Sequence, residues 1–521
     1  MLLASVSYAS PTSSPKLPVV DLGYERHEAI SYNSSTEVYQ FSNIRYAQPP
    51  VGDLRFRAPR PPLTNRNEIQ NGSQPRTCPQ GVAGWQARAF GPIGAFTNGK
   101  PFTLEAWEQA IQNSSIPPID FNKASSEDCL FLDVHVPKKI FKSKCGAPIH
   151  GGGYAFGSKN GSPTQGFVPS GLLEHAKEFS DEGMIFVALN YRLGALGFLS
   201  GQEVEQDGDL NAGLLDQRLA LQWVQGNIHL FGGSRDKVTV MGESAGGGSV
   251  LLHMTGPSNS TNIKAPFAQA IVQSPALVSN LQVPESGYAD FLSQLNVSSL
   301  ADALRDSKTA PDSLYRSFKN GAFDKSVRLL AAHNSFEGSF FFNPKVKTEE
   351  QLDSWIQNSL PGYTKKDRDH LIKDLYPFDP SLGDVAQGSS QRAIWGDAIF
   401  DCTFLTAHEA FGGNSYAYLF DVSPGFHTQD LKYTFNDPAT PAFRPIAQDI
   451  LQRAIASFTI NGEPVTKSNG TYEAFPTWGS EKSLIRIEGD SLSVRTSVVN
   501  ETRCAWWQSG YESVRVGQTH V

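Results

Sequence analysis

Residues Lys237–Gly246 read KVTVMGESAG and carry the strongest structural signal in the chain. The first five residues, KVTVM, have the composition and length of a buried strand. The next five match the pattern G-x-S-x-G, with Gly242 and Gly246 on either side of Ser244. Glycines at these positions let the backbone turn sharply from strand to helix and leave the serine exposed at the turn. The run therefore predicts a strand, a tight turn at Ser244, and a helix from about Gly247.

Strands and helices alternate on the N-terminal side of this turn. Met184–Leu189 is a continuous apolar run with the length of a buried strand. Residues 211–227 read as an amphipathic helix, which Phe231-Gly232-Gly233 closes. Alternating strands and helices predict an α/β fold with a large, mostly parallel central sheet flanked by helices. We expect one domain over residues 17–521, with a helical insertion around 284–384, and a signal segment or flexible tail at 1–16.

The composition excludes several classes of protein. Of the 521 residues, 39% are hydrophobic and 18% are charged, which is typical of a folded globular chain. No apolar stretch is long enough to span a membrane as a helix. The net charge is −8 and the basic residues are scattered, so we expect no nucleic-acid partner.

Glycosylation sequons are frequent and indicate a secreted protein. The N-terminal run LLASVSYA ends in small residues, as a signal cleavage site does, but it lacks a cationic start and a long apolar region. Each sequon alone is a weak signal. Eight asparagines begin an N-x-S/T triplet: Asn33, Asn71, Asn113, Asn160, Asn259, Asn296, Asn469 and Asn500.

A serine at such a turn needs two kinds of help to act as a nucleophile. It needs a nearby base, and it needs donors for the negative charge that develops on the attacked oxygen. The run His150-Gly151-Gly152-Gly153 offers backbone N–H groups that no side chain hinders, as an oxyanion hole requires. The start of the helix after Ser244 adds positive potential at the same place.

A serine triad in this kind of fold runs in the order serine, acid, histidine. His427 follows the strand-like run 416–420 in a turn-rich segment, where a base belongs, whereas His408 lies in a helix-like stretch and His520 at the terminus. His370 is the remaining histidine in this region. Glu337 follows the strand-like run 329–332, but composition alone does not choose it over other acidic residues.

Several long motifs resemble the type-B carboxylesterase/lipase family, the cholinesterase-like branch of the α/β-hydrolases, and in particular its secreted fungal members. The resemblance covers nearly the whole chain. The motifs, in family order, are FSNIRYAQPPVGDLRF at 41–56, SEDCLFL at 126–132, NYRLG at 190–194, GLLDQ at 213–217 and GESAG at 242–246.

The resemblance implies roles for individual residues. Ser244 matches the nucleophile, Glu337 the acid and His427 the base. The N–H groups of Gly152, Gly153 and Ala245 match the oxyanion hole, Glu243 matches a supporting carboxylate, and no metal or cofactor is needed. The implied disulfides and structural ion pairs are Cys78–Cys129, Cys402–Cys504, Arg55–Glu127 and Arg192–Asp216, with Cys145 left unpaired.

The chain departs from the family pattern at two places. Thr428 follows His427, where the family usually has glycine. The run before His150 reads KCGAPI, where the family has a longer apolar strand, and Pro148 disfavours an internal strand because it has no N–H to donate. We therefore expect a strand that is too short, or a gap in the recorded sequence, and a doubtful position for Gly152 and Gly153.

The sequence therefore predicts a serine carboxylic ester hydrolase that works through an acyl-enzyme. A run of three glycines is associated in this family with bulky alcohol groups, so we favour a broad carboxylesterase over a strict lipase. One alternative is a biosynthetic esterase or transacylase for a single natural product. An alternative of another class is a catalytically weak binding or adhesion protein on the same fold.

Overall fold

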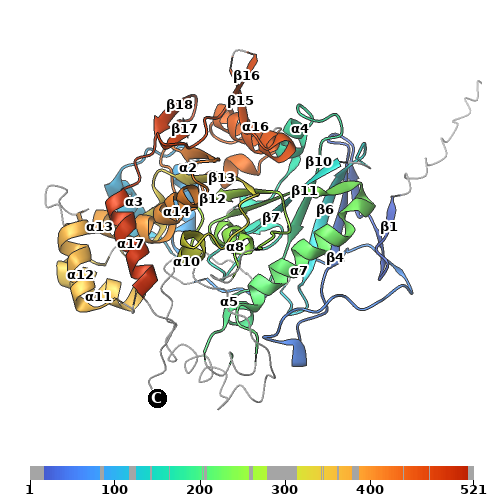
Figure 1. Cartoon of the computed structure of the whole chain (residues 1–521), viewed down its shortest axis with the longest axis horizontal. Coiled ribbons are helices and arrows are strands. Elements are labelled where there is room, and N and C mark those ends of the chain that lie inside the picture. The colour runs from blue at the N-terminus through green and yellow to red at the C-terminus, as the bar shows by residue number, and fades with distance from the viewer. Residues whose placement is uncertain are drawn as a thin grey trace, which may run out of the picture.

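The computed structural model describes residues 17–513, except 83–86, 116–124, 141–142, 163–164, 202–203, 205–207, 257–261, 278–313, 342, 344, 361–362, 378–385, 438, 440 and 469. The expected N-terminal segment 1–16 lies outside the described residues. At the middle of the molecule is a twisted 11-stranded sheet (Figure 1).

The order of the strands places the serine turn at the centre of this sheet. The neighbouring strands, in order, are β18 (Leu492–Thr496), β17 (Ser483–Ile487), β14 (Ser415–Phe420), β13 (Arg328–Asn334), β12 (Gln269–Gln273), β11 (Gly233–Glu243), β7 (Ser143–Ile149), β10 (Met184–Leu189), β6 (Phe131–Pro137), β4 (Val38–Arg45) and β3 (Ser31–Asn33). The strands from β17 to β10 run parallel to one another. Antiparallel pairs extend the sheet at both ends.

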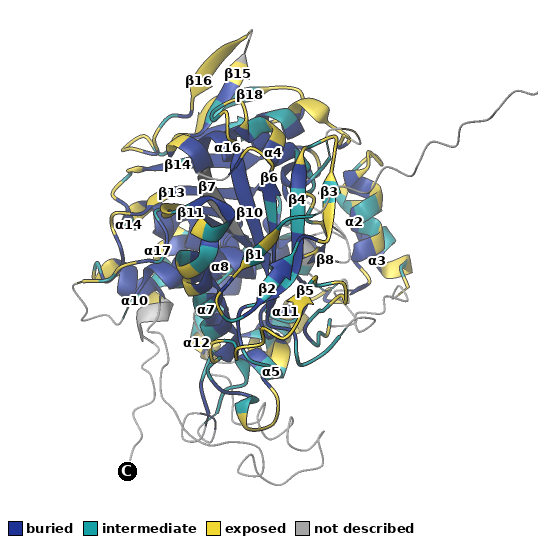
Figure 2. Ribbon diagram, turned by 90° about the vertical axis from the view of Figure 1, so that its right-hand side faces the viewer, coloured by how far each residue is buried: buried dark blue, intermediate teal, exposed yellow. Residues whose placement is uncertain are grey.

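Both faces of the sheet are covered, because apolar side chains alternate between two cores. On β11, Val240 belongs to one core and Met241 to the other, as the alternation of a strand dictates. Helices α7 (Ala212–Asn227) and α8 (Ala245–Met254) pack in the first core. Helices α4 (Ser170–Ala176) and α16 (Pro445–Asn461) pack in the second, on the other side of the sheet in Figure 1. Figure 2 shows the resulting buried layer of central strands.

Strand β7 differs from the sequence-based expectation. It runs from Ser143 to Ile149 as a strand between β10 and β11, although Pro148 lies within it. The pairing with β10 covers Lys144–Gly146 and resumes at Ile149, whereas the pairing with β11 continues through Pro148. The strand thus continues to Ile149, next to His150, and accommodates Pro148. It can do so because the hydrogen-bond ladder to β10 is interrupted beside the proline.

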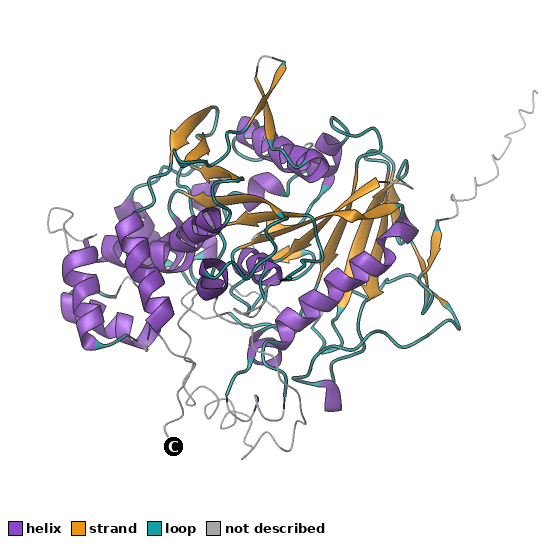
Figure 3. Cartoon of the chain, viewed as in Figure 1, coloured by secondary structure: helices purple, strands orange, loops and turns teal. Residues whose placement is uncertain are grey.

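The expected insertion around 284–384 is divided by a strand of the sheet. Its described part contains α10 (Leu314–Lys319), α11 (Glu349–Ser359) and α12 (Lys365–His370), with β13 after α10. These helices join α13 (Ala386–Trp395), α14 (Cys402–Ala410) and α17 (Glu501–Ser513) in a helical region at one end of the sheet (Figure 3). Residues 278–313 lie outside the described part.

Two further helices, α2 (Phe90–Thr97) and α3 (Leu104–Asn113), lie in the segment between Cys78 and Cys129. The remaining elements are short: β1 (Val19–Asp21), β2 (Arg26–Glu28), β5 (Ile69–Gln70), β8 (Gly161–Ser162), β9 (Gln165–Gly166), β15 (Val465–Ser468), β16 (Thr471–Ala474), α5 (Gly194–Phe198), α15 (Leu431–Thr434), the 3-10 helices 52–54, 228–231 and 337–341, and the π-helices 371–375 and 396–401. Among the described helices, none has both the length and the apolar character needed to cross a bilayer.

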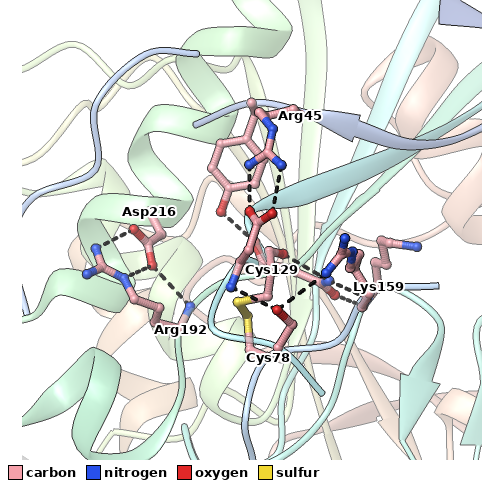
Figure 4. Close-up of a disulfide and its surroundings, with 11 residues drawn as sticks. Arg45, Cys78, Cys129, Lys159, Arg192 and Asp216 are labelled. Carbon is pink, nitrogen blue, oxygen red and sulfur yellow. Dashed lines mark hydrogen bonds and ion pairs between the residues drawn. A yellow bond between two sulfur atoms is a disulfide. The ribbon is translucent and has the colours of Figure 1, made fainter. Parts of the chain in front are cut away.

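Both implied disulfides are present. Cys78 bonds to Cys129 just before β6, and Cys402 at the start of α14 bonds to Cys504 in α17. Figure 4 shows the first of them with Arg45, Lys159 and the Arg192–Asp216 pair in its surroundings. Cys145 falls on β7, where only the backbone is described.

Both implied ion pairs are present as well, but in different surroundings. The Arg192 guanidinium donates to both oxygens of Asp216 at 2.7 Å, and both side chains are buried (Figure 4). The Arg55–Glu127 pair has the same two-bond form, with about a third of each side chain exposed.

We expect Arg192→Met to lower the free energy of unfolding by about 3–5 kcal/mol, because it leaves the buried Asp216 carboxylate without its cation. Arg55→Met is the matched control and should cost no more than about 1 kcal/mol, since water screens the exposed pair. Urea unfolding of both variants measures the difference. Equal losses would contradict the structural role of the buried pair.

Candidate active site

Ser244 lies on the turn between β11 and α8. Its backbone has φ 55° and ψ −125°, a strained conformation for a residue with a side chain. The turn is tight, because a Cβ atom built on Gly242 would lie 2.4 Å from the backbone of Gly246. Only glycine fits here, as the G-x-S-x-G pattern predicted, and the helix begins at Ala245, slightly earlier than expected.

Three side chains meet at the carboxyl end of the sheet. His427, on the loop after β14, has its Nε2 atom 3.0 Å from the Ser244 hydroxyl. Its Nδ1 atom lies 2.6 Å from Glu337 Oε2, just after β13. All three residues are buried. The structure thus brings together the three residues to which the sequence assigned a triad, joined by hydrogen bonds in the order serine, histidine, acid.

Hydrogen bonds hold the second oxygen of Glu337. The Ser274 hydroxyl donates to Oε1 at 2.6 Å, and the Asn334 backbone N–H donates to the same atom at 2.5 Å. Burial favours the neutral acid, but the electrostatic interaction with His427 and the hydrogen bonds from His427 and these donors outweigh it. The pKa of Glu337 therefore lies below its ordinary value, and the group is a carboxylate near neutral pH.

A buried polar network behind Glu337 was not predicted from the sequence. Asp430 accepts hydrogen bonds from Gln273 Nε2 and the Tyr418 hydroxyl, each at 2.9 Å, and from Asn334 Nδ2 at 3.2 Å. The Asn334 amide also donates to Ser274, so the network continues to Glu337. These residues come from separate strands and loops, and only the position of Asp430 three residues after His427 links it to the site in sequence.

Glu243 is a second carboxyl group beside the histidine. Its Oε1 atom lies 3.4 Å from His427 Nε2. This oxygen is buried and accepts no hydrogen bond from the described atoms. Burial raises the pKa of Glu243 well above its ordinary value, and the nearby carboxyl groups of Asp430 and Glu337 raise it further. The position beside Ser244 and His427 is the one that the family resemblance implied.

The His150–Gly153 loop lies directly against the serine turn. A Cβ atom built on Gly246 would lie 2.2 Å from the carbonyl oxygen of Ile149, and one built on Gly151 would lie 3.0 Å from the Cβ atom of Ser244. The loop whose position the sequence left in doubt therefore packs against the serine turn, since β7 runs beside β11 as far as Ile149. Gly152 and Gly153 both have positive φ angles, which glycine adopts without strain.

His150 fixes the first peptide of this loop. Its ring stacks on Tyr191 at 4.3 Å, and its Nδ1 atom lies 2.9 Å from the Gly151 carbonyl oxygen. Burial lowers the pKa of His150 to about 4. The ring is therefore neutral and can donate its Nδ1 proton to that carbonyl.

Aromatic rings surround the histidine and exclude water. The ring of Phe400 lies 4.1 Å from that of His427, and that of Phe341 lies 5.7 Å away. A separate apolar cluster joins helices α2 and α3 to Phe156 on the glycine loop and to Phe426 next to His427. The ring of Trp107 on α3 packs against that of Phe426 at 4.4 Å in a tilted arrangement, so α3 contacts the residue next to His427.

The other histidines and the Thr428 departure have structural explanations. His370 lies on α12 and pairs with Asp374, and His408 is buried against Trp478. His520 lies outside the described residues. Thr428 has φ 71°, the left-handed conformation that glycine adopts easily. The threonine therefore carries local strain without displacing His427.

The expected glycosylation sites lie on the surface wherever they are described. Asn33, Asn71, Asn113, Asn160 and Asn500 are exposed, and Asn259, Asn296 and Asn469 lie outside the described residues. Within the described ranges, no group of histidine, cysteine and acidic side chains is arranged to hold a metal ion.

Comparisons with known proteins identify the family of the chain. The model of the Carboxylesterase family matches residues 26–507. The chain is 34% identical to "Carboxylesterase patB" of Penicillium expansum, over 95% of this chain and 96% of that protein. It is 30% identical to "Secreted lipase" of Arthroderma benhamiae, over 74% of this chain and 83% of that protein.

A solved structure is similar over the same length. The crystal structure of Aspergillus niger EstA superposes with a TM-score of 0.72 at 25% identity, and covers 95% of this chain and 98% of EstA. The chain therefore belongs to the Carboxylesterase family, the type-B carboxylesterase/lipase family that its motifs resemble, and is a carboxylic ester hydrolase with the α/β-hydrolase fold.

Proposed function

We propose that the protein hydrolyses carboxylic esters by forming an acyl-enzyme on Ser244. The observation that carries this proposal is the chain of hydrogen bonds from the Ser244 hydroxyl through His427 to Glu337. A neutral serine hydroxyl is a poor nucleophile, and a base within hydrogen-bond reach removes its proton as it attacks.

In the first half of the reaction, the Ser244 oxygen bonds to the ester carbonyl carbon while His427 Nε2 takes the hydroxyl proton. Glu337 holds the imidazole in the correct tautomer and stabilises its charged form. His427 then gives the proton to the leaving alcohol oxygen as the ester C–O bond breaks. In the second half, water attacks the acyl group, His427 accepts its proton, and the proton returns to Ser244 as the acid leaves.

The backbone N–H groups of Gly152, Gly153 and Ala245 are proposed to hold the oxyanion of each tetrahedral intermediate. Ala245 is the first residue of α8, so its N–H points out of a helix N-terminus. The glycine loop supports the proposal because it packs against Ser244 through Gly151. Donors placed in advance contribute most where water is excluded, as among the aromatic rings here.

We further propose a broad carboxylesterase that acts outside the cell. Relatives named carboxylesterase and secreted lipase support the class of substrate and the location. The described sequon asparagines are exposed, as N-glycans require. The apolar rings beside His427 favour uncharged acyl and alcohol groups.

A transacylase would have the same triad and would differ in the acceptor of the acyl group. The two cases differ in how the acyl group is divided between water and an added alcohol. With an ester substrate and a competing primary alcohol, a hydrolase gives mainly free acid. A transacylase gives mainly the new ester. We expect mainly acid, measured by chromatography of the products. Dominance of the ester product at alcohol concentrations far below that of water would assign the protein to acyl transfer.

We expect Ser244→Ala to lower kcat for p-nitrophenyl acetate by at least about 10⁴-fold, because the nucleophile is lost. Labelling by a fluorophosphonate probe should disappear in the same variant, since only a base-activated serine reacts quickly. The unfolding midpoint serves as the control and should stay close to that of the wild type. A variant that keeps full hydrolysis, or a wild type that the probe does not label, would exclude the proposed mechanism and favour a binding protein.

We expect Ser274→Ala to lower kcat/KM about tenfold, because a hydrogen bond to a charged group contributes about 1.5 kcal/mol. Loss of this donor also raises the pKa of Glu337 towards its ordinary value. The acid side of the pH profile should therefore move to higher pH, since the carboxylate is protonated sooner as the pH falls.

Ser457→Ala is the matched control for this change. Ser457 is a buried serine in α16 whose hydroxyl donates to Ala454 within that helix, away from Glu337. It should leave both the rate and the pH profile unchanged. An unshifted acid side for Ser274→Ala would contradict the support that Ser274 gives to Glu337.

A further inference from the structure

A buried lysine follows the glycine loop at residue 159. Lys159 Nζ donates to Asp133 Oδ2 at 2.8 Å, and both side chains are under 5% exposed. A buried ion pair is not by itself a source of stability, since apolar or neutral pairs of the same size are often as stable. We therefore explain this ion pair by its effect on position: it holds the segment that carries Lys159 in one place.

Lys159 is attached to two strands of the central sheet. Asp133 lies on β6, and its other oxygen accepts the Asn43 backbone N–H from β4 at 2.7 Å. The Lys159 backbone N–H donates to the side chain of Asn190, just after β10, at 2.9 Å. Asn190 in turn donates to the Cys129 carbonyl at 3.2 Å, and Figure 4 shows Lys159 beside the Cys78–Cys129 disulfide.

The chain between the glycine run and Lys159 is a closed, tightly packed turn. The Gly152 carbonyl accepts the backbone N–H groups of Ala155 and Phe156. A Cβ atom built on Gly157 would lie 2.6 Å from His150 Nδ1, and one built on Gly152 would lie 1.9 Å from the Phe156 carbonyl oxygen. A shift at Lys159 therefore moves atoms that touch His150 and Gly152, because no empty space absorbs it.

We propose that the Lys159–Asp133 ion pair is a positioning device for the oxyanion hole, fixing the loop of Gly152 and Gly153 against Ser244. This inference rests on the proposed function. Strand β7 fixes the loop at Ile149, and the ion pair fixes it on the other side, at Lys159. Lys159 is thus a positioning residue, because it acts on the oxyanion through the backbone of the loop.

The test is the double variant Lys159→Met with Asp133→Asn, which removes both charges and leaves neither unpaired. The asparagine oxygen can still accept the Asn43 N–H, so that contact is kept. We expect kcat for p-nitrophenyl acetate to fall at least about tenfold, since small misplacements of catalytic groups have large effects on rate. KM should change less than about twofold, because the donors act on the transition state.

A control is Arg45→Met with Asp128→Asn, which removes a neighbouring ion pair between Arg45 at the end of β4 and Asp128 before β6, with about a quarter of each side chain exposed. Arg45 donates to Asp128 through two bonds of 2.6 and 2.8 Å near the same disulfide (Figure 4), and neither residue belongs to the glycine loop. Its kcat should stay within about twofold of the wild type. An equal fall of kcat in both double variants would overturn the proposal.

Asp133→Glu covers the case in which the neutral double variant does not fold. It keeps both charges but lengthens the carboxylate, so it should also lower kcat and leave KM nearly unchanged. A normal kcat in this variant, or a raised KM with normal kcat, would overturn the positioning role.

Hydrogen–deuterium exchange separates this inference from the proposed function. Amides of residues 150–160 should exchange faster in the Lys159/Asp133 double variant than in the wild type or the Arg45/Asp128 variant. Unchanged exchange would overturn the inference whatever the activity. An inactive wild type that Ser244→Ala does not alter would instead reject the proposed function.

Discussion

The close backbone contact between the serine turn and the end of β7 is the constraint on which the site depends. Gly246 can approach the Ile149 carbonyl only because it has no side chain. This contact puts the first turn of α8 beside the His150–Gly153 loop, so the nucleophile and the proposed oxyanion donors come from adjacent parallel strands. Parallel neighbours bring their carboxyl ends to one edge of a sheet, and β13 and β14 deliver Glu337 and His427 to that same edge.

The second constraint is electrostatic, because three buried carboxyl groups, those of Glu337, Glu243 and Asp430, lie close enough to influence one another's charge. The pKa of Glu337 is lowered by its interaction with His427 and by its hydrogen-bond donors, whereas burial raises the pKa values of Glu243 and Asp430. The protein thus limits the buried negative charge by making the three groups unequal. The group that contacts His427 Nδ1 is the one with the most favourable charge for stabilising an imidazolium.

Local sequence patterns predicted the parts of the fold that local physics determines. The apolar run Met184–Leu189 is β10 with the same bounds, and the helix expected at 211–227 is α7. The position of β7 was not predictable from the sequence, because a proline is unfavourable in an internal strand. Pro148 stays in the strand through the pairing of β7 with β11. Glu337 could be chosen only through the family resemblance, and Asp430 and Ser274 were missed because their partners lie on other strands.

The sheet and the helices next to it contribute differently to the site. Ser244, Glu337 and His427 lie at strand ends that many neighbours fix, so their geometry tolerates little change. A separate apolar cluster beside the site is built largely from α2 and α3, which place Trp107 against Phe426 and pack on Phe156, just after the glycine loop. Both helices belong to the segment closed by the Cys78–Cys129 disulfide. Trp107 and Phe426 are almost fully buried, so this disulfide-closed segment acts on the site through packing: it holds the loop that carries His427 against the ends of the central strands.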